Sequence, residues 1–329
     1  MIDRDAITSL GRLGHYASAL PTGADLRSLG EGGTPLLRLE TLNRWVGMPN
    51  LWIKWEGTNP SGSFKDRLHA VGFSMARQFG FRRAFLGSTG NSGVAACAYG
   101  RRNGVDVSVR VHPLTPLESI ERMKMLGGSV GPDIVGPEDS WPCTLLGPFC
   151  GRANPFGVEG YRTIAFETFA ELGRVPDRFC VPVSGGDAIY GPWKGFSELF
   201  AWGMAGSVPR MTACQAAGAD FAVRTLTLGL DRMAVVEPAT DALSIADPTG
   251  SECIRSAVES SEGTAWSVDD SESAVAWSVL AQCGLLAEFA STVPIAALAK
   301  AVRMGQCDPE ETVVAMVTSS YKKMRKRVA

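Results

Sequence analysis

The stretch Asn59-Pro60-Ser61-Gly62-Ser63-Phe64-Lys65-Asp66-Arg67 places one lysine between a tight turn and the start of a helix. The turn residues proline and glycine precede Ser63, which can cap a helix whose first turn carries Asp66. Lys65 would then stand at a fixed point of the backbone, where a lysine amine removed from water can form a Schiff base with an aldehyde. The same residues also fit an ordinary charged helix start, so the stretch alone leaves both interpretations open.

Strands and helices are expected to alternate on both sides of this stretch. A strand pattern at residues 51–56 precedes it, and a helix to about residue 80 follows it. Further strands are expected at residues 83–88, 105–111, 178–183, 211–217 and 312–317, and further helices at 92–102, 116–126, 159–172, 191–202, 250–261, 270–283 and 292–304. Such alternation predicts an α/β fold with parallel, helix-covered sheets. The glycine- and proline-rich segment 127–155 separates two such series and predicts a boundary between two lobes.

Composition and charge limit the classes of function. The 329-residue chain is 45% hydrophobic and can bury the cores of one large unit or of two lobes. Its formal net charge of -2 gives no general attraction to nucleic acid or to an anionic membrane, and the basic run at residues 322–327 is expected to be solvated. The eight cysteines include no Cys-x-x-Cys, the first residues, Met1 to Asp5, do not show the basic region and apolar run expected of a secretory leader, and no apolar run of about 18 residues occurs. We therefore expect no metal site and a soluble, cytoplasmic protein.

A second polar turn, Gly87-Ser88-Thr89-Gly90-Asn91-Ser92-Gly93, follows an expected strand and opens an expected helix. Its backbone N–H groups, hydroxyls and amide would converge on an anion at the positive end of the helix, and a carboxylate would suit it. An ordinary helix-capping turn is the alternative interpretation.

Two further turns follow later strands. Ser184-Gly185-Gly186-Asp187-Ala188 suits a phosphate held by backbone amides, with the Asp187 carboxylate pointing outward or capping the helix; a simple strand-to-helix turn is the alternative. Thr318-Ser319-Ser320 ends the last strand, at the carboxyl edge where ligands of parallel sheets collect, and a hydroxyl there can meet a heterocyclic nitrogen. Taken alone, it also fits a turn at the end of a strand.

Together the four turns match the needs of pyridoxal 5'-phosphate. Its aldehyde needs a lysine, its phosphate a glycine loop, its phenolic oxygen an amide and its ring nitrogen a polar partner. In this order, the motifs resemble those of the fold-type II pyridoxal-phosphate enzymes, the tryptophan synthase β superfamily, and most of all the threonine synthases. The likeness extends from about residue 31 to residue 323. It is carried by Glu31-Gly32-Gly33-Thr34-Pro35-Leu36, Asn59 to Arg67, Ser88 to Ser92, Asn154-Pro155 with Glu159-Gly160, Pro182 to Gly186, Trp193-Lys194-Gly195-Phe196, and Thr318.

The resemblance implies a role for each turn. Lys65 would be the Schiff-base lysine and proton shuttle, Asn91 would contact the phenolic oxygen, and Thr318 would meet the ring nitrogen. The substrate's α-carboxylate would be bound by Ser88, Thr89 and Ser92. The cofactor phosphate would be bound by Ser184, Gly185, Gly186, Asp187 and Ala188.

The resemblance also implies an architecture. It predicts two lobes, each with a mainly parallel, helix-covered sheet, and the cofactor in the cleft between them. Residues 1–75 and 161–329 would form the larger, cofactor-binding domain, and residues 76–160 a smaller mobile domain inserted in it. A homodimer is expected, with a small amino acid as the ligand and neither nucleic acid nor membrane as a partner.

The chain departs from the threonine synthase pattern where the substrate phosphate is recognised. Gly151-Arg152 and Gly157 stand where the family has an Asn-Ser pair and an arginine, although Arg152 and Arg162 could supply new donors for the substrate. In Ala287-Glu288-Phe289-Ala290-Ser291, Glu288 falls where the family usually has Glu-Pro-Ala-Ser, and it either faces the cofactor or caps a helix. After Thr318, Ser319-Ser320-Tyr321 replaces a glycine-rich pattern and is expected to alter the side of the ring nitrogen.

The predicted activity is that of a pyridoxal-phosphate lyase or synthase. It would eliminate or replace a β or γ leaving group on a small L-amino acid, as a threonine synthase does, with Lys65 taking the α proton. One alternative is β-replacement on serine, phosphoserine or an O-acylserine in a specialised biosynthetic pathway. Another is a non-catalytic protein that binds an amino acid through the same fold. A nicotinamide oxidoreductase is disfavoured, because no Gly-x-Gly-x-x-Gly follows a strand with an acidic residue about 20 positions on.

Overall fold

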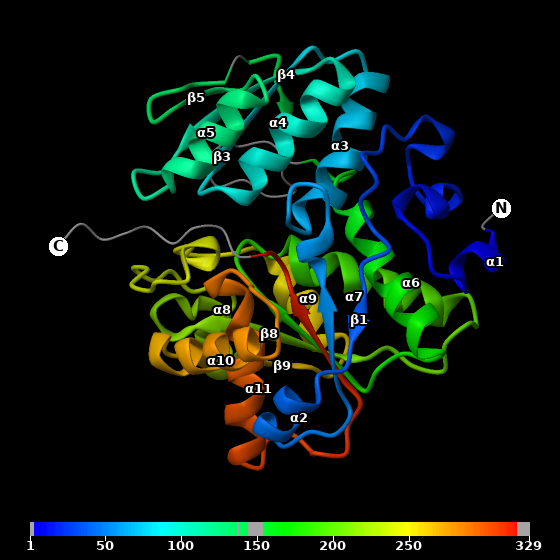
Figure 1. Ribbon diagram of the computed structural model, residues 1–329, viewed down its shortest axis with the longest axis vertical. Helices are drawn as coiled ribbons and strands as arrows, with labels where there is room; N and C mark the ends of the chain where they lie inside the picture. The colour runs from blue at the N-terminus through cyan, green and yellow to red at the C-terminus, as the bar shows by residue number, and fades with distance from the viewer. Residues whose placement is uncertain (1–2, 137, 144–153, 321–329) are drawn as a thin grey trace.

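The chain folds around two separate β-sheets. The computed structural model describes residues 3–136, 138–143 and 154–320. A four-stranded sheet occupies the upper part of the view in Figure 1, and a six-stranded sheet the lower part. The smaller sheet has the order β5 (Ser129–Gly131), β4 (Asp106–Val111), β3 (Arg83–Ser88), β6 (Trp141–Pro142). The larger has the order β1 (Leu36–Leu37), β2 (Leu51–Trp55), β10 (Val313–Val317), β7 (Arg178–Pro182), β8 (Arg210–Ala216), β9 (Thr264–Val268).

Helices cover both sheets. All strand pairings of the two sheets are parallel except that of β1 with β2, so each connection between parallel neighbours needs a crossover, usually a helix. The helices above are α3 (Lys65–Gln78), α4 (Asn91–Asn103) and α5 (Leu117–Met125). Around the larger sheet lie α2 (Glu40–Val46), α6 (Glu159–Leu172), α7 (Asp187–Ala201), α8 (Phe221–Leu228), α9 (Glu252–Glu259), α10 (Asp270–Gln282) and α11 (Val293–Arg303). The short helix α1 (Arg4–Ile7) packs against α6.

The larger sheet separates two hydrophobic cores. Along β10, Val314 and Met316 belong to the core shared with α6 and α7, whereas Val313, Ala315 and Val317 belong to the core shared with α10 and α11. Successive side chains of a strand point to opposite faces, so a strand buried on both faces is apolar at every position. A third core lies around the smaller sheet, with α3 and α4.

The predicted α/β fold with two lobes on mainly parallel sheets is confirmed. The strand at 83–88 and the helix at 159–172 have the predicted bounds. One prediction was wrong: α7 begins at Asp187 and not near residue 191, because Gly186 ends the turn and Pro192 is accommodated inside the helix. The prediction of a lobe boundary was also wrong for part of 127–155, since β5 and β6 belong to the smaller sheet. The sequence analysis missed α2, α8 and β9.

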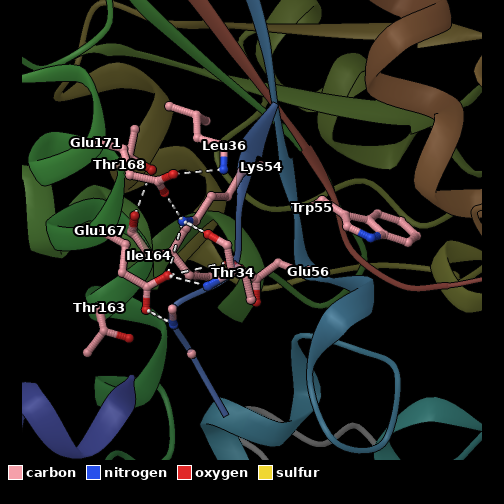
Figure 2. A network of polar contacts seen from close by, with 12 residues as sticks. Thr34, Leu36, Lys54, Trp55, Glu56, Thr163, Ile164, Glu167, Thr168 and Glu171 are labelled. Carbon is pink, nitrogen blue, oxygen red and sulfur yellow. Dashed lines mark hydrogen bonds and ion pairs between the residues drawn. The ribbon is translucent and has the colours of Figure 1, made fainter. Parts of the chain in front are cut away.

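A buried ionic network joins the lysine turn to the larger sheet. Arg67 Nε lies 2.8 Å from Glu56 Oε2, and Arg67 Nη1 lies 2.6 Å from Glu167 Oε1, with all three side chains inaccessible to solvent. Lys54 Nζ lies 3.0 Å from Glu167 Oε2 and 2.8 Å from Glu171 Oε1. Figure 2 shows Lys54 reaching from β2 toward these two carboxylates of α6. Thr34 completes the network, since its carbonyl accepts from Lys54 Nζ at 2.6 Å.

The charges of the network outweigh the cost of burial at Glu167. Burial alone would raise the pKa of this carboxyl, but the charges of Arg67 and Lys54 lower it to about 2. A depressed carboxyl pKa contributes stability that is present above the unfolded value of about 4.3 and is lost as the pH falls through the folded value. The network should therefore hold near neutral pH and fail in acid between about pH 5 and pH 2.

Replacing Glu167 by glutamine should strongly destabilise the protein. The Glu167→Gln variant keeps the shape of the side chain but removes the carboxylate that Arg67 and Lys54 share, which leaves two buried cations with only Glu56 and the partly exposed Glu171, so the free energy of unfolding should fall by about 3–5 kcal/mol near neutral pH. Urea denaturation followed by circular dichroism measures it, with the exposed Glu259→Gln as the matched control, expected within about 0.5 kcal/mol of wild type. The two proteins should approach each other in stability toward pH 2, and a Glu167→Gln variant as stable as its control would contradict this account.

Candidate active site

The lysine turn is paired with the chain that follows β10. The amide of Phe64 donates to the carbonyl of Thr318 at 2.9 Å, and the amide of Ser320 donates to the carbonyl of Gly62 at 3.0 Å. Ser63 and Ser319 form an isolated antiparallel bridge between these contacts. The two motifs, more than 250 residues apart in sequence, therefore form one surface at the carboxyl ends of β2 and β10.

Lys65 is half-buried at the start of α3. Its amide donates to Ser63 Oγ at 3.3 Å, but Phe64 occupies the cap position and no side chain caps the helix, so the prediction that Ser63 is the cap was wrong. Its Nζ lies 4.6 Å from the centre of the Phe64 ring and 5.8 Å from that of Tyr161. No carboxylate in the described part of the chain forms an ion pair with it, which distinguishes it from the buried Lys54. The amine therefore lies against aromatic faces and is not held in an ion pair, which leaves it available to react with an aldehyde.

The Ser88 to Ser92 turn connects β3 to α4. Ser88 Oγ accepts from the amides of Gly90 at 3.0 Å and Gly93 at 2.9 Å, which fixes the turn and leaves the hydroxyl proton available to a ligand. Gly90, at φ 152°, ends the turn at a conformation that favours glycine. Thr89 is exposed, and Ser92 Oγ lies 2.9 Å from Nε2 of the buried His69.

Asn91 links the two sheets across the site. Its Nδ2 donates to Glu288 Oε2 at 2.5 Å and lies 3.4 Å from Ser319 Oγ. Glu288 also accepts from Ser319 Oγ at 2.5 Å and from Ser244 Oγ, and it makes no side-chain cap to the short helix after it. Of the two roles considered for Glu288, the structure supports the one that faces the site.

The turn from Ser184 to Ala188 connects β7 to α7. The amides of Gly186, Asp187 and Ala188 donate to no other described residue, and they lie at the positive end of a 15-residue helix. A Cβ at Gly186 would come 2.6 Å from Ser251 Oγ, and Gly186 has φ 120°, so only glycine fits. The loop thus presents free backbone donors, which suits a phosphate.

Two carboxylates flank this loop. Ser184 Oγ donates to Asp247, and Asp187 is buried, with Oδ1 3.6 Å from where a Cβ of Gly185 would stand. The expectation that Asp187 points outward or caps the helix was wrong, because Gly186 occupies the cap position and Asp187 turns back over the loop. Burial raises the pKa of Asp247, while the hydrogen bond from Ser184 and the charge of Lys65 act to lower it.

Thr318 lies at the carboxyl end of β10 and is buried. Its Oγ1 lies 2.8 Å from Ser291 Oγ, which in turn lies 3.2 Å from Ser319 Oγ. The position expected to meet the ring nitrogen therefore carries neutral hydroxyls.

The donors predicted for a substrate phosphate are not found together among the described residues. Arg152 and Gly151 lie outside the described residues. Arg162 is engaged by two carboxylates, with Nε 2.7 Å from Glu159 and Nη1 2.5 Å from Glu198. Gly157 packs on α3, where a Cβ would come 3.0 Å from Leu68 Cγ, so a larger side chain there would require Leu68 to shift.

The sequence analysis did not select His69, Asp247 or Ser291. For His69 a signal existed, because residues four apart lie on one face of a helix and Lys65 precedes it by four. The contacts of Asp247 and Ser291 join segments far apart in sequence and left no local pattern. No cluster of three His, Cys, Asp or Glu side chains suited to a metal occurs in the residues described. None of the described helices is long and apolar enough to cross a membrane.

Known proteins resemble this chain over most of its length. The family model described as "Pyridoxal-phosphate dependent enzyme" matches residues 27–136 and 138–319. The threonine synthase of Methanosarcina acetivorans is 35% identical over 317 residues, which cover 92% of this chain and 78% of that protein. That of Halalkalibacterium halodurans is 34% identical over 326 residues, which cover 94% and 88%. The solved structure of maize serine racemase superposes with a TM-score of 0.73 at 17% identity, covering 88% and 89% of the two chains, and thus shares the fold. The resemblance and the cofactor predicted from the motifs are confirmed.

The charge of Asp247 should weaken the binding of a phosphate at the loop. The Asp247→Asn variant keeps an acceptor for Ser184 and removes the charge, so its affinity for pyridoxal 5'-phosphate should exceed that of wild type by about tenfold at high pH. Below the raised pKa of Asp247 the wild-type carboxyl is neutral and the two proteins should bind alike; their ratio should grow as the pH rises through that pKa.

Fluorescence titration of the apoprotein from about pH 5 to pH 9 measures this ratio, and taking a ratio cancels the titration of the phosphate itself, whose second pKa is about 6. Asp231→Asn, at an exposed carboxylate, is the matched control. A ratio of wild type to Asp247→Asn that does not change with pH would contradict the assignment.

Proposed function

Because the chain belongs to the family of pyridoxal-phosphate-dependent enzymes, we propose that it is a lyase or synthase that acts on a small L-amino acid with a β or γ leaving group, as threonine synthases do. The observation that carries this proposal is Lys65. Its amine lies at the carboxyl ends of the strands, is fixed by the turn before α3, and has no carboxylate partner among the described residues.

The residues present fit the cofactor at each of its polar ends. The unpaired amides of Gly186, Asp187 and Ala188 suit its phosphate, and the glycine at 186 is required by the close approach of Ser251. Asn91, which donates to Glu288 and so lies between the two sheets, suits the phenolic oxygen. Thr318 suits the ring nitrogen.

Each of these residues has a definable task. When bound, the cofactor supplies an electron-withdrawing ring that stabilises negative charge at the substrate's α carbon. Lys65 Nζ would hold the aldehyde and, once released, take the α proton. Ser88, Thr89 and Ser92 would bind the α-carboxylate at the positive end of α4. The neutral hydroxyl of Thr318 does not keep the ring nitrogen protonated, which favours elimination or replacement over transamination.

The leaving group is the point on which two candidate functions differ. Threonine synthesis from phosphohomoserine is supported by the likeness to threonine synthases. β-Replacement on serine or an O-acylserine is favoured by the paired state of Arg162 and by the glycine at position 157, which leave few cations for a substrate phosphate among the described residues. Phosphoserine, the other candidate for β-replacement, would need such cations as phosphohomoserine does. A non-catalytic binding role is disfavoured, because Lys65, Asn91 and the glycine loop are all retained.

We also propose the finer features of the enzyme: a mobile domain of residues 76–160 inserted in one made of 1–75 and 161–329, a homodimer, and a cytoplasmic location. Opening of the domains would break two hydrogen bonds. One runs from Asn91 to Glu288, and the other from Arg122 Nη2 to the Ser61 carbonyl at 2.8 Å. Hydrogen exchange in 76–160 that substrate leaves unchanged would count against the mobile domain. A monomer in sedimentation velocity, or recovery in the membrane or secreted fraction, would contradict the other two.

Replacing Lys65 by alanine should abolish both cofactor attachment and turnover. The purified wild-type protein should be yellow from cofactor bound to Lys65, and Lys65→Ala should lose this visible band. Turnover should fall by at least about a thousandfold, since proton transfer by a positioned group alone contributes about 10²–10⁴-fold. Lys124→Ala, at an exposed lysine of α5, is the matched control and should retain both. A colourless wild-type protein that gains no visible band with added cofactor would contradict the catalytic proposal.

The substrate class should appear in a spectral titration of the yellow protein. Phosphohomoserine, phosphoserine, O-acetylserine, serine and threonine are added one at a time, and the shift of the visible band is recorded. A response to phosphohomoserine and not to the serine derivatives selects threonine synthesis. The reverse response selects β-replacement or β-elimination, which the surroundings of Arg162 and Gly157 favour.

A further inference from the structure

One buried histidine lies between the lysine and the carboxylate turn. His69 is the fifth residue of α3, one helical turn after Lys65, and it is 1% exposed. Its Nε2 lies 2.9 Å from Ser92 Oγ, and its ring packs on Phe73, with 5.7 Å between ring centres. Residues 65, 69 and 73 follow the four-residue spacing of one helix face, so this face of α3 is turned toward the start of α4.

The imidazole of His69 is neutral at physiological pH. Burial and the charge of Lys65 lower its pKa to about 3, and a hydrogen bond with the backbone of Ser92 acts in the opposite direction. A neutral imidazole carries a proton on only one of its two nitrogens. The direction of the hydrogen bond to Ser92 is therefore set by the tautomer.

The two tautomers give Ser92 opposite properties. If Nε2 is bare, the Ser92 hydroxyl donates to it, and the oxygen lone pairs are left to face a ligand. If Nε2 carries the proton, it donates to Ser92 Oγ, and the Ser92 hydroxyl is free to donate onward. A carboxylate has only acceptors, so it is attracted in the second case and repelled in the first.

We propose that His69 is a substrate-positioning residue: its Nε2–H donates to Ser92 Oγ and so directs the Ser92 hydroxyl proton toward the α-carboxylate of the amino-acid substrate. This inference rests on the proposed function, because it assumes that the turn from Ser88 to Ser92 binds that carboxylate. It adds a residue outside the turn that determines whether the turn is complementary to an anion.

The surroundings of His69 indicate a role beyond packing. The α3 face next to α4 is otherwise apolar at Phe73, and a buried polar group is costly unless it is hydrogen-bonded. The partner of His69 is the second residue of α4, where the helix dipole already favours an anion. A side chain such as methionine would fill the space but would leave the orientation of Ser92 undetermined.

The tautomer can be read directly in the holoenzyme. The chain has three histidines, at positions 15, 69 and 112, so ¹⁵N-histidine labelling gives three ring systems, and the spectrum of His69→Gln identifies the missing one. We expect the Nε2–H tautomer for His69 across the neutral pH range. A Nδ1–H tautomer would overturn the proposal, whatever the activity of the enzyme.

Substitutions separate the hydrogen bond from packing. In His69→Gln the side-chain amide can occupy the place of Nε2–H, whereas His69→Met removes the donor at similar volume. With L-threonine, serine and phosphohomoserine as probes, His69→Met should bind the responding amino acid about tenfold more weakly or worse, and His69→Gln should stay within about threefold of wild type. Neither should change the affinity for the corresponding amino-acid amide, which lacks the carboxylate. Equal losses for acid and amide, or wild-type binding by His69→Met, would refute the positioning role.

A double-mutant cycle tests whether His69 acts through Ser92. If it does, His69→Met adds little to the loss already caused by Ser92→Ala, whereas independent effects would add. Thermal unfolding and the visible band of each variant report on folding and on cofactor binding. Should His69→Met fail to fold, the tautomer and the His69→Gln and Ser92→Ala variants still decide the question. A wild-type protein without a visible band would refute the proposed function, while a yellow protein whose His69 variants bind like wild type would refute only this inference.

Discussion

The pairing of Arg67 with Glu56 and Glu167 is the interaction on which the site depends. Arg67 lies two residues after Lys65, so whatever holds its guanidinium also fixes the first turn of α3. Its two partners come from the segment after β2 and from α6, and all three side chains are fully buried. Such a buried group is strongly destabilised if one member is lost. The helix that carries Lys65 is thereby fixed to the larger sheet, although its apolar face belongs to the core of the smaller one.

The second constraint is that the ligand-facing groups come from strand ends of both sheets. β3 supplies the Ser88 to Ser92 turn, β7 the glycine loop, and β10 the hydroxyls of Thr318 and Ser319. Carboxyl ends of parallel strands in open sheets are where ligands collect. Here two such edges face each other and are joined by Asn91, through Glu288 and Ser319. A ligand between them touches both sheets, which couples its binding to their relative position.

Local turn chemistry explains why the turns that form the candidate site could be predicted from the sequence. The residues at 59–67, 88–92 and 184–188 each combine a glycine, short polar side chains and a helix start, which are short-range signals, although the cap positions are occupied by Phe64, Gly90 and Gly186. The orientation of Asp187 depended on whether Gly186 or Asp187 occupies the cap position, a difference of one residue that propensity does not resolve. Glu167, a partner of Arg67, and Asn91, a partner of Glu288, lie about 100 residues or more away in sequence, so no local pattern predicts these contacts. From the sequence, His69 could not be distinguished from an ordinary helix residue, because its proposed role depends on Ser92, which belongs to the next helix.

The electrostatics of the site link the two ends of the expected cofactor. At the glycine loop the phosphate would meet backbone amides and a helix end, while the nearby side-chain charges, Asp187 and Asp247, are negative. Lys65 is a cation that acts on Asp247 from the aldehyde end. The charge of Lys65 favours the ionised form of Asp247, whereas burial favours the neutral form. Because the side chains nearest the loop are carboxylates, the backbone amides and the helix end have to hold a doubly charged group there. The lysine that would bind the aldehyde thus also acts, through Asp247, on the place of the phosphate.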